Sequence, residues 1–341
     1  MIRVLVVDDV AFMRIAIRRM IEQDKDMKVV GEARNGAEAI KLARELTPDV
    51  VTMDIEMPGM NGLDATTGIM ESVSPPPAIV MVSATTQAGA ADTVEALRRG
   101  AVDFVSKSSV FTNTDLAHIE NELRPIVRAW ATRRGTPVPT IARQPPPPAP
   151  RRPFDLVVIG ASTGGPQALG KLLLATGKVG VPVVIAQHMP RFFTASLALM
   201  LAKDTGLDVR EAVPHEALLP GSVYIIAGGQ HGSMVRGVAG FRIRFEATTD
   251  GGSPSIDRLL LSAAACAASP LGVLLTGMGR DGCDGAVELH RRGASVLVQS
   301  PIECVVAGIP AAVIEAGAAD AVLPLADLGA WIKSAVGGGV P

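Results

Sequence analysis

The 341-residue sequence predicts two doubly wound α/β domains, each built on a parallel sheet and joined by a proline-rich linker. Strand-like and helix-like segments alternate five times within residues 1–130, and a second series runs through 154–336. Hydrophobic residues make up 48% of the chain but aromatic residues only 3%, so the cores must be built from aliphatic side chains, as packed parallel sheets usually are. Residues 131–153, between the two series, are assigned to the linker.

The composition bears on the cellular location of the protein more than on its function. A net charge of −2 favours no class of partner, and no apolar run approaches the ~20 residues of a membrane-spanning helix. The first residues carry no cationic, apolar leader, so we expect a cytoplasmic protein without membrane insertion. Cys266, Cys283 and Cys304 are widely spaced and odd in number, which favours reduced thiols over a disulfide framework or a metal cluster.

The first domain is expected to hold five strand–helix units. Its predicted strands are 4–9, 27–33, 48–58, 78–84 and 101–107; the helices that follow them end near Ile21, at 45, at 70, at 100 and near Trp130. Units of this length imply right-handed crossovers and a doubly wound sheet. The functional groups of such a sheet lie at the carboxyl ends of its strands.

Those strand ends carry three carboxylates, a hydroxyl and an ammonium. Asp8 and Asp9 end the first strand, Asp54 the third, Ser83 the fourth and Lys107 the fifth. Carboxylate oxygens suit Mg²⁺, and a lysine can pair with a phosphoryl oxygen. Any one of these residues could be a solvated charge at a strand end, but chance explains all five together poorly.

This set resembles the receiver domain of two-component response regulators, which has a flavodoxin-like fold, and the resemblance covers the whole segment. It implies that Asp54 is the phosphoacceptor and that Mg²⁺ is held by Asp8, Asp9, Asp54 and the carbonyl of Glu56. It also implies that Ser83 and Lys107 contact the phosphoryl group.

Two further positions of this domain bear on the resemblance. Phe104 takes the place of the switch aromatic of receivers, although a half-buried core ring explains it about as well. Receivers usually have a proline after the lysine, whereas Ser108 follows Lys107 here, so the usual cis-proline turn is not expected.

The linker is rich in proline and arginine. Eight prolines lie between Thr136 and Phe154, which predicts an extended spacer of 17 residues that could span ~50 Å. Seven arginines and no acids lie between Arg124 and Phe154, and such an arm can bind nucleic acid. No helix-turn-helix pattern follows and no aromatic residues interleave the arginines, so we favour a solvated linker and expect no nucleic-acid partner.

The second domain opens with a buried strand, 156–159, that breaks at Gly160 into a glycine-rich turn. Gly160, Ser162 and Gly164 match G-x-S-x-G, in which a sharp strand-to-helix turn exposes a nucleophilic serine. The same glycines could instead cradle a dinucleotide phosphate or simply form a tight turn. A dinucleotide site needs an acid at the end of the next strand, where Gln187 and His188 stand instead, so the nucleophile is favoured.

Two more strand ends supply partners for this serine. His188 follows the strand next along the chain and is the candidate base, with His231 as the alternative base or a substrate contact. Asp281 follows a strand ending near Leu275 and could orient the imidazole. Asp284 is the alternative acid, although its place at a helix start favours a capping role.

Four long motifs of this domain, GASTGGPQAL, QHMPRFFTASLA, SPSIDRLLLSAA and LLTGMGRDGCDGA, resemble the Rossmann-like catalytic domain of chemotaxis protein-glutamate methylesterases. The resemblance implies that Ser162 is the nucleophile, His188 the base and Asp281 the orienting acid. Thr163 and the Met278 N–H would then face the oxyanion. A receiver linked to this domain is the architecture of that family, so the resemblance covers nearly the whole chain.

The resemblance also implies the activity and its partners. The family hydrolyses glutamate γ-methyl esters on the cytoplasmic helices of chemoreceptors, some members deamidate glutamine, and a chemotaxis histidine kinase is the phosphodonor. The esterase itself would need no cofactor. The chain departs from the family in the segment from Gln299 to Ala307, where Ser300 and Pro301 follow Gln299 and Ala307 precedes GIP; this segment is expected near the mouth of the site. The rival hypothesis is a binding protein in which the receiver controls a non-catalytic α/β domain or DNA contact through the basic arm.

Overall fold

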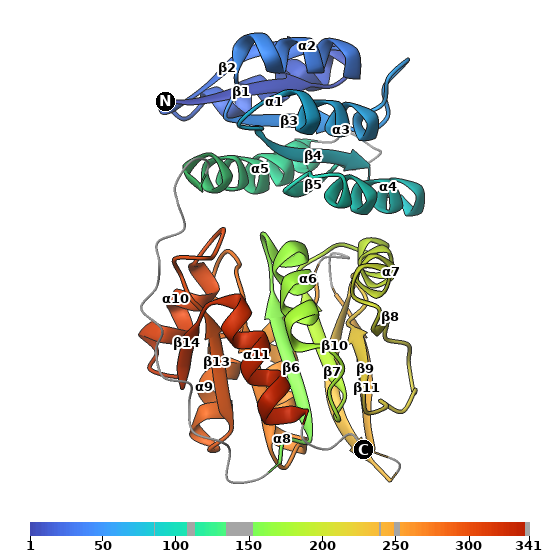
Figure 1. Ribbon diagram of the computed structural model, residues 1–341, viewed down its shortest axis with the longest axis vertical. Helices are drawn as coiled ribbons and strands as arrows, with labels where there is room; N and C mark the ends of the chain where they lie inside the picture. The colour runs from blue at the N-terminus through green and yellow to red at the C-terminus, as the bar shows by residue number, and fades with distance from the viewer. Residues whose placement is uncertain (85, 108–112, 134–152, 239, 249–252, 338–341) are drawn as a thin grey trace. The chain divides into compact units, whose positions relative to one another are not determined.

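The computed structural model describes residues 1–84, 86–107, 113–133, 153–238, 240–248 and 253–337 (Figure 1). The chain divides into two compact units, Met1–Pro137 and Val138–Pro341. Ser108 and nearly all of the predicted linker lie outside the described residues. Each unit is an α/β domain with a parallel sheet, which confirms the predicted fold class.

The first unit contains the five predicted strand–helix units. Within the described residues its parallel sheet has the order β2-β1-β3-β4-β5. The strands are β1 (Ile2–Val7), β2 (Met27–Ala33), β3 (Val50–Asp54), β4 (Ala78–Ala84) and β5 (Asp103–Lys107). The helices are α1 (Ala11–Glu22), α2 (Gly36–Leu46), α3 (Gly62–Ser72), α4 (Gln87–Arg98) and α5 (Asn113–Arg133).

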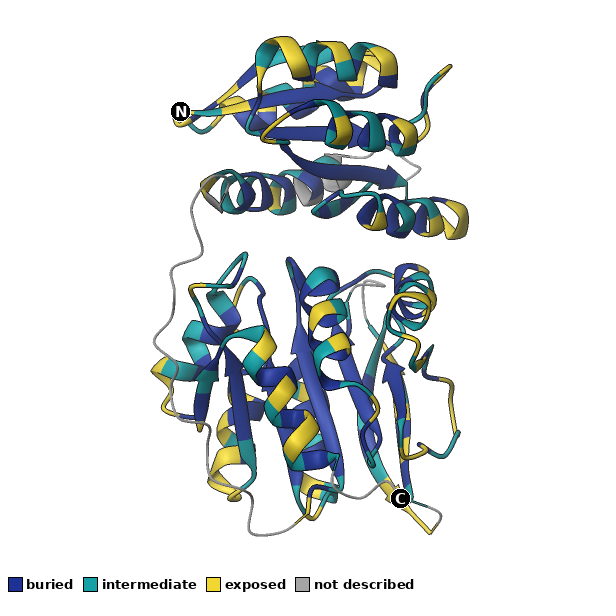
Figure 2. Cartoon of the chain, in the orientation of Figure 1, coloured by how far each residue is buried: buried dark blue, intermediate teal, exposed yellow. Residues whose placement is uncertain are grey.

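Local sequence explains where the elements of this unit begin. All five residues of β3 are buried, as expected of a central strand covered on both faces (Figure 2). Asn35, Asn61 and Thr86 each precede a helix and accept a hydrogen bond from the backbone N–H three residues later. Such N-caps satisfy an otherwise unpaired donor, each worth about 1 kcal/mol.

In the described part of the second unit, seven parallel strands form a sheet of order β14-β13-β12-β6-β7-β9-β8. Its strands are β6 (Leu156–Ala161), β7 (Val183–Gln187), β8 (Asp208–Glu211), β9 (Ser222–Ile225), β12 (Pro270–Leu274), β13 (Ser295–Gln299) and β14 (Ala321–Leu323). Its helices are α6 (Gly165–Thr176), α7 (Phe193–Thr205), α8 (Ile256–Cys266), α9 (Cys283–Arg291), α10 (Gly308–Glu315) and α11 (Leu325–Val336). The central strand β6 lies between β7 and β12, so the strand order reverses beside it.

Alternate residues of β6 serve two different cores. Leu156 and Val158 pack in a cluster with residues of α8, α9 and an antiparallel hairpin, β10 (Gln230–Gly237) with β11 (Gly240–Ala247). This hairpin was not identified from the sequence. Val157 and Ile159 point to the opposite face, which α6 and α11 cover (Figure 1).

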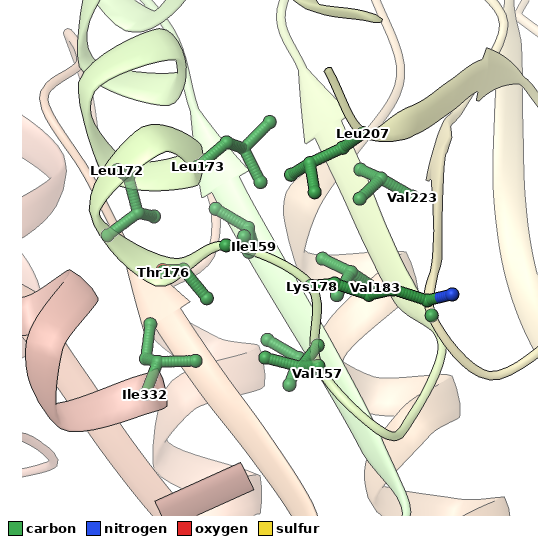
Figure 3. Close-up of a pocket in the computed structure, with 13 residues that line it drawn as sticks. Val157, Ile159, Leu172, Leu173, Thr176, Lys178, Val183, Leu207, Val223 and Ile332 are labelled. Atoms are coloured by element: carbon green, nitrogen blue, oxygen red, sulfur yellow. The ribbon is translucent and has the colours of Figure 1, made fainter. Parts of the chain in front are cut away.

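A small cavity lies on the face covered by α6 and α11 (Figure 3). Val157, Val183 and Lys178 line it, which places it where β6 and β7 begin and away from their carboxyl ends. Its volume of about 10 Å³ is room for roughly one water molecule. It is too small to be a substrate site.

Among the described residues, no helix combines the length and apolar character needed to cross a membrane.

Candidate functional site

Ser162 lies directly after β6, in a turn that is fixed on both sides. Its backbone N–H donates to the Thr276 carbonyl (3.0 Å), and its carbonyl accepts from Gly165 N–H (2.7 Å). Gly164 has a φ of 75°, and a Cβ there would lie 2.6 Å from Val305 Cγ2, so this position requires glycine. The turn leads at once into α6.

The first glycine of the motif acts differently from expected. The strand does not break at Gly160 but continues to Ala161. A Cβ on Gly160 would lie 2.3 Å from Ile256 Cγ2. Gly160 therefore allows α8 to approach the sheet closely, and the turn itself depends on Gly164.

His188 bridges the serine and the aspartate. Its Nδ1 lies 3.1 Å from Ser162 Oγ, and its Nε2 lies 2.8 Å from Asp281 Oδ2. An ionised carboxylate can only accept, so Nε2 carries the proton and Nδ1 is free to accept from the serine hydroxyl. The strand order explains the meeting, because Ser162 follows the central strand and its partners follow the strands on either side.

The Asp281 carboxylate lies at the start of α8. It accepts from the backbone N–H groups of Ile256 (2.8 Å) and Asp257 (2.9 Å) and from the Ser255 hydroxyl (3.2 Å). Burial by itself raises the pKa of Asp281, but the hydrogen bonds from His188, Asp257 and Ile256 hold the pKa well below its usual range. The acid is therefore ionised wherever the protein is folded near neutral pH.

The α8 contacts were missed in the sequence. The motif SPSIDR marks a helix start, because Ser255 is its N-cap and its side chain accepts from Arg258 N–H. That signal locates the helix, but it does not say which carboxylate the helix start would hold.

Two buried glutamines hold the backbone around the site. Gln187 Nε2 donates to the carbonyls of Ser162 (3.0 Å) and His188 (3.1 Å). Gln299 Oε1 accepts from Thr276 N–H (2.8 Å), and only 1% of Gln299 is exposed. Gln299 was expected near the mouth of the site; it is instead part of the buried framework beneath it.

The two alternative residues do not reach Ser162. His231 Nδ1 accepts from Ser255 N–H (3.1 Å), which places it next to the α8 start. The Asp284 side chain is 74% exposed, in the first turn of α9, and lies 3.5 Å from the Arg280 guanidinium. The contacts therefore favour His188 as base and Asp281 as acid.

The oxyanion residues stay a prediction. Thr163 and Met278 are both half-buried and lie in the two turns that meet at Ser162. Close packing joins the turns, since a Cβ on Gly277 would lie 2.7 Å from Ser162 Cβ.

The receiver site gathers at the carboxyl ends of β1, β3 and β5. Carboxylate oxygens of Asp8, Asp9 and Asp54 lie within 4.8 Å of one another, and Lys107 Nζ lies 2.7 Å from Asp54 Oδ1. Burial raises the pKa of Asp54 to about 6, against the opposing attraction of Lys107, and burial also raises the pKa of Asp8. Three carboxylates this close together, with Asp8 and Asp54 buried and Asp9 exposed, are a donor set that fits a hard divalent cation.

Arg14 supports this acidic site and was missed in the sequence. It is 9% exposed, and its guanidinium donates to the carbonyls of Asp8 (2.8 Å) and Asp9 (3.0 Å). Glu32 on β2 holds the same guanidinium (3.4 Å). An arginine on an amphipathic helix gives no sequence signal for this role.

Of the remaining predicted receiver residues, Ser83 and Phe104 lie on the expected strands, whereas β3 ends at Asp54, before Glu56. Ser83 is buried at the end of β4, and its hydroxyl donates to the Gly89 carbonyl (3.3 Å). Phe104 is half-buried on β5, and the Glu56 side chain is exposed just after β3. The switch role of Phe104 and the metal contact of the Glu56 carbonyl stay predictions.

Residues 157–332 match the family model for the CheB methylesterase, and residues 4–118 match that for the response regulator receiver domain. The chain is similar to a protein-glutamate methylesterase/protein-glutamine glutaminase from Caulobacter vibrioides, at 43% identity over 96% of both chains. One from Thermotoga maritima is 41% identical over 95% of both. The crystal structure of the Thermotoga maritima CheB methylesterase catalytic domain aligns with a TM-score of 0.52 at 35% identity, covering 54% of this chain and all of that one. The chain therefore belongs to the CheB methylesterase family, as a response regulator that joins a receiver domain to an esterase domain.

Proposed function

We propose that this protein hydrolyses glutamate γ-methyl esters on the cytoplasmic helices of chemoreceptors, and that phosphorylation of its receiver by a chemotaxis histidine kinase activates it. The observation that carries the proposal is the imidazole of His188, bonded to Ser162 on one side and to Asp281 on the other. The names of the relatives support methylated protein glutamate as the substrate class and extend it to protein glutamine. A receiver-controlled binding protein would need none of this geometry.

The residues act in a defined order. Ser162 Oγ attacks the ester carbonyl while its proton passes to His188 Nδ1, and Asp281 stabilises the imidazolium that forms. The tetrahedral intermediate collapses, and methanol leaves with the proton from Nδ1. Water, activated by the same nitrogen, then hydrolyses the acyl-enzyme and restores Ser162. With glutamine as substrate, ammonia is the leaving group.

The negative charge that develops on the ester carbonyl oxygen must be stabilised by hydrogen-bond donors. We assign these to Thr163 and the Met278 N–H, because both lie in the turns that flank Ser162. Removing one such donor typically costs 10²- to 10³-fold in kcat. The esterase chemistry uses only groups of the protein and water.

Phosphoryl transfer is assigned to the receiver. Asp54 attacks the phosphoryl group, with Lys107 placed to contact one of its oxygens. Asp8, Asp9, Asp54 and the Glu56 carbonyl would hold Mg²⁺, which when bound neutralises charge on the transferred group. We infer a cytoplasmic location, where the kinase and receptor helices are accessible.

Methanol release from methylated receptor tests the esterase. Ser162→Ala should lower the rate by several orders of magnitude, whereas Ser334→Ala, an exposed serine on α11, should leave it unchanged. Near-normal turnover by Ser162→Ala would end the assignment of Ser162 as the nucleophile, and no methanol release by the unmodified protein would favour the binding-protein alternative.

Acetyl phosphate with Mg²⁺ tests the receiver independently. The protein should be labelled at Asp54 only, and Asp54→Asn should stay unlabelled. Label persisting on that variant would show that a different residue accepts the phosphoryl group.

A further inference from the structure

His231 is linked to the esterase site through the start of α8. Its Nδ1 accepts from Ser255 N–H (3.1 Å), and the Ser255 hydroxyl donates to Asp281 Oδ1 (3.2 Å). Asp281 in turn holds His188. The second histidine therefore contacts the acid through a single intervening residue, on the side away from the base.

We propose that His231 and Ser255 are positioning residues of the esterase: His231 fixes Ser255, and Ser255 fixes the Asp281 carboxylate that orients His188. The inference rests on the proposed function and adds two residues to it. Neither residue is required to touch the substrate.

In this arrangement the Ser255 hydroxyl and the Ser255 backbone N–H both have hydrogen-bond partners. The Ser255 hydroxyl donates its proton to Asp281 and accepts from Arg258 N–H (3.3 Å) through an oxygen lone pair. Its own N–H precedes α8 and has no helical partner, and His231 Nδ1 supplies the acceptor. Substituting either residue would leave a polar group near the acid without its partner.

His231 belongs to β10, so it ties the hairpin to the helix start. Asp257 links the start of α8 to α9. Its carboxylate accepts from Gly285 N–H (2.8 Å), and its own backbone N–H donates to Asp281. The carboxylate is thus bonded to the start of α8, and that helix start is bonded in turn to α9 and to the hairpin. A catalytic geometry fixed in this way is sensitive to small displacements, since about 1 Å can cost 10²-fold in rate.

The test compares variants that keep the hydrogen-bond acceptor of His231 with variants that remove it. Nδ1 can accept from Ser255 only when it carries no proton. The Oδ1 atom of asparagine can take the place of Nδ1, so His231→Asn keeps the acceptor, whereas His231→Leu removes it. Likewise Ser255→Thr keeps the hydroxyl and Ser255→Ala removes it.

The experiment measures kcat and KM for methanol release by the full-length chain. His231→Leu and Ser255→Ala should each lower kcat about 10- to 100-fold with KM within twofold, and the Asn and Thr variants should recover most of the loss. His290→Leu serves as the matched control: this histidine, on α9, lies 3.2 Å from Asp320 and should not affect kcat. A rise in KM with kcat unchanged would overturn the proposal, because it would make His231 a substrate contact.

A double-mutant cycle shows whether the effect passes through the acid. In the Asp281→Ala background, His231→Leu should lower kcat no further; an equal loss in both backgrounds would overturn the proposal. The ¹H resonance of the His188 Nε2 proton in ¹⁵N-histidine-labelled protein provides a second readout, measured on whichever of Ser255→Ala and His231→Leu is folded. It should move from its position in the unmodified protein, and an unmoved resonance would contradict the proposal.

The outcome can be told apart from failure of the proposed function. If Ser162→Ala is inactive but His231→Leu retains full kcat, only the positioning inference is wrong. If Ser162→Ala keeps near-normal turnover, the assignment of Ser162 as nucleophile is wrong, and with it the site that His231 and Ser255 would position.

Discussion

The imidazole of His188 presents Nδ1 to the Ser162 hydroxyl, at 3.1 Å, and directs Nε2 to Asp281. In the general Ser-His-Asp template the two nitrogens have the opposite assignment, with Nε2 facing the serine. Here the nitrogen nearer the backbone faces the serine hydroxyl, and the far nitrogen faces the Asp281 carboxylate. Both arrangements place one neutral acceptor at the serine and one donor at the carboxylate, so the chemistry is the same.

This arrangement predicts the effect of Asp281→Asn. Asp257 N–H and the Ser255 hydroxyl both donate to Oδ1, so the single amide oxygen would take that position. The NH₂ group at the Oδ2 position would then face His188 Nε2 and drive the proton to Nδ1. Nδ1 could then no longer accept from Ser162, and kcat should fall on the order of 10⁴-fold. Methanol release measures it, with Asp284→Asn as the control. A larger loss in the control would make Asp284 the acid.

The low pKa of Asp281 predicts a pH dependence of stability. Because the folded-state pKa lies below the unfolded value of about 3.9, this residue stabilises the fold above that pH, and the contribution is lost as the pH falls below it. The free energy of unfolding of the unmodified protein should exceed that of Asp281→Asn by about 1–3 kcal/mol at pH 7. The difference should shrink below pH 4. Denaturant unfolding of both proteins from pH 2 to 7 checks this; a pH-independent difference would contradict it.

Gly277→Ala should damage the site through packing. The added Cβ would lie 2.7 Å from Ser162 Cβ and 2.5 Å from Ile309 Cδ1. Relieving those contacts must move the nucleophile, so we expect kcat to fall at least tenfold and stability to fall by about 1–3 kcal/mol. Gly170→Ala, inside α6 with its Cβ 3.7 Å from Leu201, is the control and should be slightly stabilising with full activity. Equal kcat in the two variants would refute the packing argument.

Phosphorylation control should require the receiver. Acetyl phosphate should stimulate methanol release by the full-length chain, while a fragment without residues 1–150 should not respond to it. A modification shifts an equilibrium only through its different free energy in the two states, so a tenfold stimulation would correspond to about 1.4 kcal/mol. The Asp54→Asn protein should match the unphosphorylated chain. Stimulation of the fragment would place the control outside the receiver.

The sequence was most informative where chemistry follows a strand end. Asp54, Lys107, Ser162 and His188 could be placed because parallel strands deliver their carboxyl ends to one edge, whatever the details of packing. The ring orientation of His188 could not be predicted, since it depends on side-chain torsions set by Asp281. Ser255 was invisible as a site residue because its role depends on how α8 packs against the turn after β12.

Misjudged positions have physical reasons as well. Gln299 is polar and ends β13, which favours a place at the edge of the site, but its amide oxygen is needed to pair the buried Thr276 N–H. Gly160 looks like a turn residue, but it is a strand residue whose missing Cβ admits Ile256. A pattern of residue types does not distinguish a group that faces substrate from one that completes a buried hydrogen bond.

The position of Asp281 at the start of α8 has a consequence for how this scaffold can evolve. Active-site residues commonly lower stability, so their loss is tolerated once function is no longer selected. Asp281 completes a helix start, and a chain that loses it loses stability along with turnover. The Ser162 side chain does not complete a helix start, so its loss should not cost the fold comparable stability. Descendants of this fold that abandon catalysis should therefore discard the serine first and retain the aspartate.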